Sequence, residues 1–459
     1  MSGHDLNPTL LRKYDIRGVV GDNLGEEDAR AIGRTFGSIV AEEGGSFVCV
    51  GRDGRLSSSG MAAALIDGFR QSGIRVVDIG LAATPMLYFA SKMLNAGGAI
   101  MVTGSHNPPN YNGFKLVLHN APFWSDQIRA LGERSAKGDW CNGKGAHLTL
   151  DVQEAYVRRL LQDYKTDREL KVVWDVGNAS VGPAVVELAR RLPGQHVVLN
   201  EEVDGTFPAH HPDPTVPENL TDLIDTVKGM DYDLGVAFDG DGDRIGAVDG
   251  EGRIVWGDQL LAIYAAELLS RRPGVEVIAD VKASQVLFDE IERLGGKPVM
   301  CAPGHSVIKS LMAESGAPLA GEMSGHVFFA DGYYGYDDAL YAAVRLLDIV
   351  AKSDQSLADM ISAMPQMINT PEIRIDVLEE RKFAIVDEVL AQARSANLDI
   401  NDVDGLRVSG PDGWWLLRAS NTENALVVRC ESHDQEGLER LKATVVAYLS
   451  AANVTAPAF

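Results

Sequence analysis

The sequence contains few cysteines for its length, and they lie far apart. The four among its 459 residues are Cys49, Cys141, Cys301 and Cys430, and no two form a Cys-x-x-Cys pair. This spacing excludes a dense disulfide framework and offers no thiolate metal motif. It favours a protein of the reducing cytosol.

Positive charge is also scarce. The chain has 42 Lys and Arg against 65 Asp and Glu, which gives a formal net charge of −23. Because nucleic-acid binding depends on neutralising phosphates with basic side chains, this balance argues against a nucleic-acid partner. A local cationic cleft for a small anionic ligand is still compatible with it.

Long apolar runs are missing as well. No stretch reaches the ~20 consecutive apolar residues that a membrane-spanning helix needs. The first residues lack the basic region followed by an apolar one that is typical of secretory signals. We therefore expect a cytoplasmic protein with no membrane partner.

A strand–loop–helix–strand pattern occurs three times along the chain. It covers 46–79, 171–199 and 276–301, with an acidic residue at or just past the exit of each first strand. Domains of roughly 100–200 residues predict three or four domains in this length. From about residue 369 the pattern changes to two helices and several strands in antiparallel order.

These patterns predict an α/β protein with three related mixed α/β domains in series and a smaller C-terminal α+β domain. We expect a hinge near 364–370. The expected domains are 1–150, 151–253, 254–366 and 367–459.

The segment 99–115 is the first candidate site. A short apolar run, 99–102, predicts a buried strand, and Ser105 and His106 follow at its exit. Two prolines then stiffen the loop. Lys115 lies ten residues after the serine, and Gly113 is expected to let the chain turn back toward it. Open α/β sheets carry chemistry at such strand exits. A polar, proline-rich connector without function is the alternative.

The segment 239–244 is the second candidate. Asp239, Asp241 and Asp243 alternate with two glycines directly after the apolar run 234–238. Glycine lets the backbone curl, so the three carboxylates can converge on one point. An oxygen-only site suits a hard cation such as Mg²⁺. The spacing does not fit an EF-hand loop. A tight acidic hairpin turn is the alternative.

Two further loops offer polar groups for a sugar phosphate. The segment 321–326 supplies a carboxylate, a hydroxyl and an imidazole, which suit vicinal sugar hydroxyls. The segment 418–423 supplies a guanidinium, two hydroxyls and an amide, which suit an oxyanion. Ordinary turns are the alternative in both cases. Arg17 offers a fork for phosphate, and His305 precedes an expected helix over 307–313.

Taken together, the segments 103–115, 239–244, 321–326 and 418–423 resemble the α-D-phosphohexomutases, in that family's order and spacing. The resemblance covers nearly the whole chain and is strongest to the bacterial phosphomannomutase/phosphoglucomutase branch. It implies four domains around a central cleft. It also implies an isomerase that moves a phosphoryl group reversibly between C1 and C6 of mannose and glucose phosphates. The implied route is a phosphoserine and a 1,6-bisphosphate intermediate, with Mg²⁺ as cofactor and glucose 1,6-bisphosphate as activator.

The resemblance also implies roles for individual residues. The phosphoryl carrier would be Ser105, and its phosphate would join the metal ligands Asp239, Asp241 and Asp243. The other catalytic candidates are His106, Lys115, Arg17, Arg244 and His326, with Lys115 and His326 as general acid and base. The substrate-binding candidates are Tyr14, Arg17, Lys282, His305, Glu322, Met323, Ser324, Gly325, His326, Arg418, Ser420, Asn421 and Thr422.

Other functions stay open at this point. A phosphoglucosamine mutase is one alternative, although that branch has Gln where Met323 stands. A phosphotransferase with Asp239 as nucleophile and metal ligands from Asp337 and Asp338 is another. A non-catalytic sugar-phosphate-binding protein on the same fold is a third. The expected partners are hexose phosphates, and the expected state is a monomer, with a dimer as the alternative.

Overall fold

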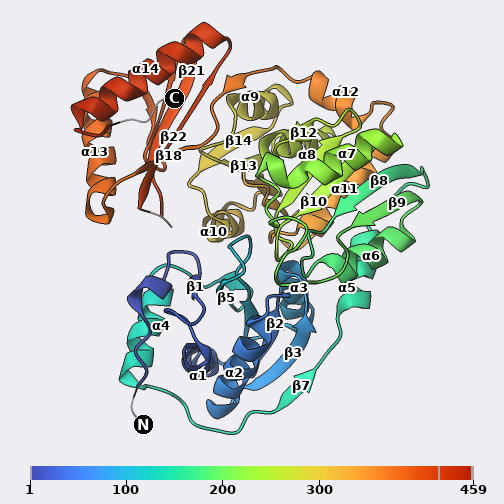
Figure 1. The fold of residues 1–459 in the computed structure, drawn as a ribbon, viewed down its shortest axis with the longest axis vertical. Helices are drawn as coiled ribbons and strands as arrows, with labels where there is room; N and C mark the ends of the chain where they lie inside the picture. The colour runs from blue at the N-terminus through green and yellow to red at the C-terminus, as the bar shows by residue number, and fades with distance from the viewer. Residues whose placement is uncertain (1–2, 422–423, 456–459) are drawn as a thin grey trace.

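The computed structural model describes residues 3–421 and 424–455 and divides them among four β-sheets (Figure 1). The sheets follow one another along the chain, and the fourth domain, drawn in orange and red, lies beside the third and across a gap in the ribbon from the first. Among the described residues, no helix is both long and apolar enough to cross a bilayer.

The three expected repeats form three sheets with one strand order. In each sheet, the first strand of the repeat pairs in parallel with the second strand on one side and with the third strand on the other. The third strand also pairs with a fourth, which runs antiparallel to it. The shared strands are β2 (Phe47–Arg52), β3 (Arg75–Leu81), β4 (Gly98–Val102) and β5 (Tyr111–Leu118); β8 (Leu170–Asp175), β9 (Gly194–Leu199), β10 (Leu234–Phe238) and β11 (Ile245–Asp249); β13 (Glu276–Asp280), β14 (Lys297–Cys301), β15 (Leu319–Gly321) and β16 (Val327–Phe329).

Short strands and helices complete the three repeats. The added strands are β1 (Ile16–Val19), β6 (Ala121–Pro122) and β7 (His147–Thr149) in the first sheet and β12 (Ile254–Val255) in the second. The helices are α1 (Glu26–Glu42), α2 (Ser58–Gln71), α3 (Thr84–Leu94), α4 (Asp126–Lys137), α5 (Gln153–Leu161), α6 (Gly182–Arg191), α7 (Thr221–Met230), α8 (Gly257–Arg271), α9 (Gln285–Arg293), α10 (His305–Ser315), α11 (Ala339–Lys352) and α12 (Leu357–Ser362), with 3₁₀ turns at Pro8–Leu10 and Pro217–Leu220.

The first three domains share one apolar core. Buried side chains of α3, α5, α8 and α11 belong to a single cluster that runs through all three. Leu87, Tyr156, Leu261 and Leu346 are representative members. Since burial of apolar surface is the main stabilising contribution, these domains form one continuous body.

The fourth domain has its own core. Its strands are β17 (Ile368–Asn369), β18 (Ile373–Asp376), β19 (Asp399–Asn401), β20 (Leu406–Gly410), β21 (Gly413–Ala419) and β22 (Ala425–Ser432), covered by α13 (Glu379–Ser395) and α14 (Gln435–Ala451). Its apolar contact with the third domain is a small cluster, Val281, Trp414 and Leu416. The expected hinge at 364–370 enters this domain, and β17 lies within it.

The predicted fold class is confirmed, and a few local expectations change. Gly113 lies inside β5, opposite Arg17 of β1, and the chain reverses earlier, between β4 and β5. A Cβ atom at Gly113 would lie 2.2 Å from the carbonyl oxygen of Ile16. The glycine therefore permits the close approach of β1 and makes no turn. Helix α10 begins at His305, two residues earlier than expected, while β17 and β19 were not expected.

We propose the same division into four domains, with one boundary moved. The strand β12 pairs with β11 in the second sheet, so the second domain is better ended after Val255 than at residue 253.

Several buried polar side chains fasten the fourth domain to the third, among them Arg407, Arg429 and Glu431. Arg407 donates to the carbonyl oxygens of Val281 at 2.8 Å and Ala283 at 2.7 Å, and its guanidinium lies 3.8 Å from the centre of the Trp414 ring. Only 1% of Arg407 is exposed.

Replacing this arginine is expected to loosen the fourth domain. Because Arg407→Met leaves two buried carbonyls without donors, it should lower the free energy of unfolding by about 3 kcal/mol. Scanning calorimetry should show an earlier transition. The exposed pair of Arg394 with Asp402 provides the control, and Arg394→Met should cost under about 0.5 kcal/mol. An unchanged thermogram for Arg407→Met would contradict this role.

Candidate active site

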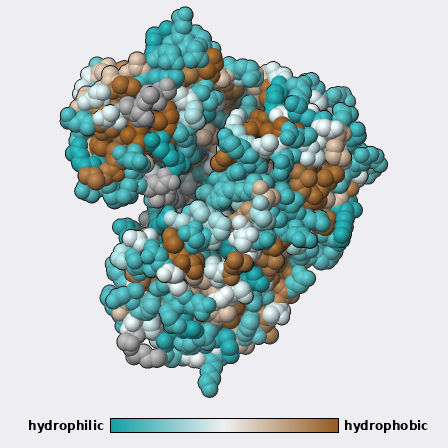
Figure 2. All heavy atoms as spheres, in the orientation of Figure 1, coloured by the Kyte–Doolittle hydropathy of each residue, from teal (hydrophilic) through white to brown (hydrophobic). Residues whose placement is uncertain are grey.

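A cleft of about 570 Å³ lies where the four domains meet. In Figure 2 the surface is hollowed where the fourth domain faces the first, and hydrophilic residues surround the hollow. Most of the predicted site residues line this cleft: Tyr14, Arg17, Ser105, His106, Lys115, Arg244, Lys282, His305, Glu322, Met323, Ser324, His326, Arg418, Ser420 and Asn421.

The repeated strand order explains why these residues meet. The loop between β4 and β5 carries Ser105, the equivalent loop between β10 and β11 carries the three aspartates, and the loop between β15 and β16 carries 322–326. Each loop leaves the carboxyl end of a parallel strand, and such ends share one edge of a sheet. In the fourth domain, the loop after β21 adds Ser420 and Asn421.

Ser105 stands in a strained backbone conformation against the aspartates. Its φ is +50°, a left-handed value that non-glycine residues rarely adopt. The Ser105 hydroxyl donates to Asp239 Oδ2 at 3.1 Å, and the Ser105 Oγ atom also lies 3.2 Å from His106 Nδ1. A Cβ atom at Gly240 would lie 2.3 Å from the Ser105 carbonyl oxygen. Glycine at 240 therefore allows the two loops to touch.

The three aspartates form a buried anionic cluster. Their carboxylate oxygens lie within 4.8 Å of one another, and none of the three side chains is exposed. Asp239 Oδ1 accepts the backbone N–H groups of Gly242, Asp243 and Arg244 at 3.0–3.1 Å. Among the described residues, Asp241 Oδ1 has no hydrogen-bond partner, and Asp243 Oδ1 has only an ion pair with His326 Nε2 at 3.4 Å. Clustered carboxylates with an unpaired oxygen fit a hard divalent cation.

Lys115 supplies positive charge to this cluster. Its ammonium group donates to Asp241 at 2.7 Å and also to Asp243. Burial acts to lower the pKa of Lys115, but the aspartates outweigh it and raise that pKa. Burial and the neighbouring aspartates raise the pKa of Asp239. Burial would also raise the pKa of Asp243, but Lys115 and His326 hold it well below its ordinary value.

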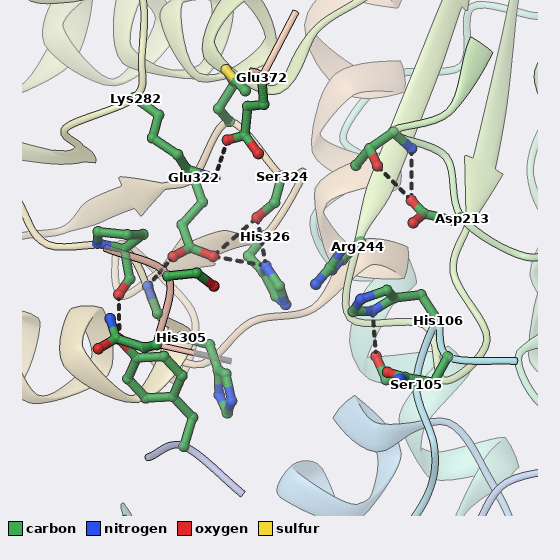
Figure 3. Close-up of a pocket in the computed structure, with 18 of the residues that line it drawn as sticks. Ser105, His106, Asp213, Arg244, Lys282, His305, Glu322, Ser324, His326 and Glu372 are labelled. Carbon is green, nitrogen blue, oxygen red and sulfur yellow. Dashed lines mark hydrogen bonds and ion pairs between the residues drawn. The ribbon is translucent and has the colours of Figure 1, made fainter. Parts of the chain in front are cut away.

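His326 lies between the aspartate cluster and the 321–326 loop, and Figure 3 shows it beside Glu322 and Ser324 of that loop. Its Nε2 atom lies 3.4 Å from Asp243, and its Nδ1 atom lies 2.9 Å from Glu322. Burial acts to lower the pKa of His326, but these two carboxylates raise it to about 9. The hydroxyl of Ser324 donates to Glu322 at 3.0 Å. The imidazolium is thus held between Asp243 of the aspartate cluster and Glu322 of the 321–326 loop.

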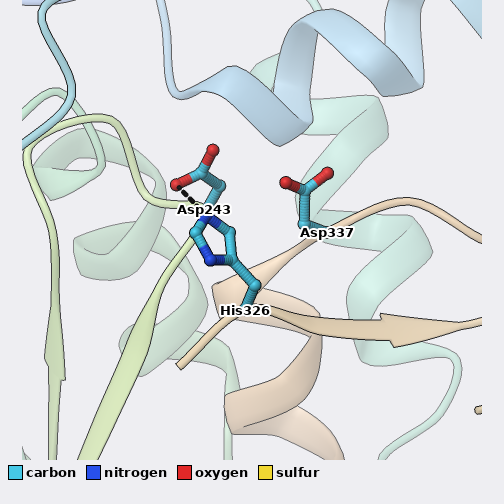
Figure 4. Close-up of side chains that lie close together, drawn as sticks. All are labelled: Asp243, His326 and Asp337. Atoms are coloured by element: carbon cyan, nitrogen blue, oxygen red, sulfur yellow. Dashed lines mark ion pairs between the residues drawn. The ribbon is translucent and has the colours of Figure 1, made fainter. Parts of the chain in front are cut away.

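Asp337 stands beside this histidine (Figure 4). Its carboxylate accepts from Lys309 at 2.8 Å and lies 3.7 Å from His305 Nδ1. Burial and nearby cations, Lys309 first, lower the pKa of His305 well below its ordinary value. His305 is thus a neutral imidazole at the start of α10, and it lies next to the charged imidazole of His326.

The far wall of the cleft joins the first domain to the fourth. The hydroxyl of Tyr14 donates to the Pro303 carbonyl at 2.9 Å and accepts from Asn421 at 3.3 Å. Burial raises the pKa of Tyr14, so the phenol stays neutral. Arg418 pairs with Asp404, and the ammonium of Lys282 lies 3.0 Å from Glu372. This wall thus presents two cations, each paired with a carboxylate.

Comparisons with known proteins agree with this arrangement over the whole chain. Four phosphoglucomutase/phosphomannomutase families match in order: alpha/beta/alpha domain I at residues 8–140, domain II at 154–252, domain III at 256–368 and the C-terminal domain at 372–447. The chain belongs to the phosphoglucomutase/phosphomannomutase family. The predicted membership in the α-D-phosphohexomutase superfamily is therefore confirmed.

Individual relatives of this phosphohexomutase are similar over nearly its full length. The phosphomannomutase/phosphoglucomutase of Pseudomonas aeruginosa is 45% identical over 452 residues, which are 98% of each chain. A phosphoglucomutase of Neisseria meningitidis is 41% identical and covers 94% of this chain and 95% of its own. The crystal structure of a family protein from Burkholderia thailandensis superposes with a TM-score of 0.93 at 42% identity, covering 98% of both chains.

Some predicted residues of this phosphohexomutase lie outside the cleft wall. The three aspartates lie beneath Ser105 rather than on the surface of the cleft. Gly325 has a φ of +90°, and a Cβ atom there would lie 2.4 Å from the Ile245 carbonyl oxygen, so it shapes the loop. Thr422 lies outside the described residues.

Several residues that hold the site were not singled out from the sequence. Asp53 accepts from the hydroxyl of Thr103 at 2.8 Å and from the N–H of Gly104 at 3.2 Å. His211 contacts the carbonyl oxygen of His106 and lines the cleft. Both residues follow strands of the repeated units. For Asp53, the sequence did offer one signal, because an acidic residue stands at or just past the exit of the first strand in each repeat.

A buried ion pair beneath His211 makes the stability of this region depend on pH. His210 Nε2 lies 2.9 Å from Asp175 Oδ2. Burial acts to lower the pKa of His210, but Asp175 outweighs it and raises that pKa above the ordinary 6.5. A group whose pKa rises on folding stabilises the protein below its unfolded pKa, and the effect fades as pH rises through the folded pKa.

The Tm difference between the wild type and His210→Gln should therefore be largest near pH 6 and shrink toward pH 9. Asp175→Asn should remove this dependence, because the neutral amide no longer favours the charged imidazole. Thermal unfolding of the wild type, the two single variants and the double variant across this range measures it. A Tm difference between the wild type and His210→Gln that grows as pH rises would contradict the raised pKa of His210.

Proposed function

We propose that this phosphohexomutase moves a phosphoryl group reversibly between C1 and C6 of mannose and glucose phosphates. The observation that carries the proposal is the hydroxyl of Ser105. The backbone of Ser105 is strained, and its hydroxyl is buried against Asp239 of the aspartate cluster and lines a cleft that also carries cationic groups. The activities named for the Pseudomonas and Neisseria relatives support the same substrates.

The proposed reaction has two matched transfers. In the first, the P–Oγ bond of phospho-Ser105 breaks, a new P–O bond forms on the free hydroxyl of the hexose phosphate, and the hydroxyl proton passes to a base. The product is a 1,6-bisphosphate, with glucose 1,6-bisphosphate as the activator that loads the enzyme. After the intermediate reorients, its other phosphoryl group returns to Ser105. Lys115 and His326 are our candidates for the acid and base in both directions.

The proposed metal is Mg²⁺. Asp239, Asp241 and Asp243 would hold it together with the Ser105 phosphate, and the close grouping of the three carboxylates with the unpaired Oδ1 of Asp241 supports this ligand set. When bound, Mg²⁺ would neutralise negative charge on the transferring group. Arg17 and Arg244 line the cleft beside Ser105 and would add to that neutralisation, while His106 would orient the serine oxygen.

The sugar would be held by its shared features. We assign Glu322 and Ser324 to O3 and O4, which glucose and mannose have in common, so that C2 is not recognised. The non-reacting phosphate would bind Arg418, Ser420, Asn421 and Thr422 on the fourth domain, with Tyr14, Lys282, His305 and Met323 lining the sugar site. Reorientation needs a cleft that opens, and the small contact between the third and fourth domains favours a hinge there.

The contacts of Asp338 weigh against it as a metal ligand for an aspartate nucleophile. The Asp338 carboxylate accepts from the hydroxyls of Tyr156 at 2.8 Å and Tyr333 at 2.7 Å and from the N–H of Tyr341, so it anchors α11. We also propose that the protein is a monomer in the cytoplasm. Its partners would be small hexose phosphates, with neither nucleic acid nor membrane among them.

Ser105→Ala is expected to remove mutase activity. Losing the group that carries the phosphoryl should lower kcat by about 10⁴-fold or more, as for other nucleophile deletions. A coupled assay for hexose 6-phosphate measures this. Ser91→Ala is the control, since that buried hydroxyl contacts Asn120, away from the cleft. Retention of full activity in Ser105→Ala would exclude the serine as carrier.

Mannose 1-phosphate and glucose 1-phosphate should give kcat/KM values within about tenfold of each other in the presence of Mg²⁺, because C2 is not recognised. Glu322→Gln should lower both values about 10–100-fold, since a charged acceptor is lost, and leave their ratio unchanged.

Glucosamine 1-phosphate, assayed in parallel, tests the third sugar class. If it were the preferred substrate, the protein would be a phosphoglucosamine mutase. If all three sugars were inert, a non-catalytic binding protein would be favoured.

A further inference from the structure

A single buried arginine holds the whole loop that carries Ser105. Arg55 lies between β2 and α2, outside the cleft lining, and its side chain is fully buried. It donates from Nη2 to the carbonyl oxygens of Ser105 and Asn107, both at 2.6 Å, and from Nη1 to those of Pro108 and, at 3.1 Å, Tyr111.

The guanidinium has no spare donor. Its Nε–H bonds Asp53 at 3.2 Å, so all five N–H groups of Arg55 are used. The same aspartate binds the hydroxyl of Thr103 and the N–H of Gly104 at the start of the loop. The arginine and its partner therefore hold the loop from its first residue to its last.

These bonds bear directly on the strained serine. A backbone with φ of +50° persists only where its surroundings over-determine it. The Ser105 carbonyl points back at Arg55, and the Ser105 hydroxyl is thereby presented on the opposite side, to Asp239 at 3.1 Å. The fit is close, because a Cβ atom at Gly104 would lie 2.6 Å from the Arg55 guanidinium carbon.

The second domain covers the arginine from behind. The ring of Phe207 lies 5.2 Å from the guanidinium, and a Cβ atom at Gly205 would lie 2.4 Å from the carbonyl oxygen of Gly54. His211, on the same segment of the second domain, contacts the His106 carbonyl oxygen. The serine loop of the first domain is therefore clamped by the domain that carries the aspartates.

We propose that Arg55 is the positioning residue for phosphoryl transfer: it curls the 105–111 loop so that Ser105 Oγ faces the aspartate cluster, and Phe207 holds it there. This rests on the proposed function of Ser105. Lysine cannot replace it, because a single ammonium has three donors at one point and cannot reach four carbonyls at once.

The test compares Arg55→Lys with Arg52→Lys, a matched change in the same segment at a part-exposed arginine whose side chain, among the described residues, hydrogen-bonds only the Asp53 carbonyl. Misplacing a reacting atom by about 1 Å costs about a hundredfold in rate, so kcat of folded Arg55→Lys should fall about a hundredfold. Its KM should stay within about threefold, because the sugar-binding groups lie on other loops. Hydrogen exchange of the 103–111 peptide should rise, with the rest of the first domain unchanged.

Three results would overturn the proposal: a wild-type kcat in folded Arg55→Lys, a KM that rises in step with the fall in kcat, or exchange that rises throughout the first domain. If Arg55→Lys does not fold, Phe207→Leu replaces it. That variant should lower kcat about fivefold and raise exchange at 103–111 only. A wild-type kcat together with wild-type exchange at 103–111 in Phe207→Leu would also overturn the proposal.

The two proposals fail in different ways. If the wild type and Arg52→Lys were both inert as mutases, the proposed function would be wrong. Exchange of the 103–111 peptide would still report whether Arg55 holds the loop, since it does not depend on activity.

Discussion

Three aspartates buried within 4.8 Å of one another are the constraint on which the site depends. Like charges at this distance in a dry interior repel strongly, so the fold must bring cations to them. Lys115 comes from the first domain, the N–H groups of the aspartate loop itself surround Asp239, and His326 comes from the third domain. The charge balance of one loop thus explains why three domains must close on it, and why its free oxygens suit a metal.

The equivalent placement of the three loops makes this convergence possible. Each follows the same strand of the same repeated unit, so the serine, the aspartates and the residues 322–326 emerge at matching edges of three sheets. Because helices of all three domains share one core, these loops are held at fixed distances. The fourth domain is different: it has its own core and meets the third through a small apolar cluster and the buried polar side chains of Arg407, Arg429 and Glu431. Less apolar surface therefore joins the fourth domain to the third than joins the first three domains to one another.

Local sequence patterns predicted much of the fold and of the site. The features they missed depend on contacts between residues far apart in the chain. The three repeats, the C-terminal domain and the four loops were visible because strand exits, glycines and clustered polar residues are short-range signals. The role of Gly113 was misjudged, because its reason is a neighbouring strand nearly 100 residues earlier in the chain. Arg55, His211 and Asp337 gave no local sign of their roles, since each acts through partners that only the folded chain brings near.

The most direct measurement locates the phosphoryl group on the enzyme. The wild type would be incubated with glucose 1,6-bisphosphate labelled with ³²P, digested, and its labelled peptide identified. The account predicts one acid-stable phosphoester on the peptide that contains Ser105. An acyl phosphate on the peptide that contains Asp239, removed by hydroxylamine, or the absence of any covalent label would contradict it.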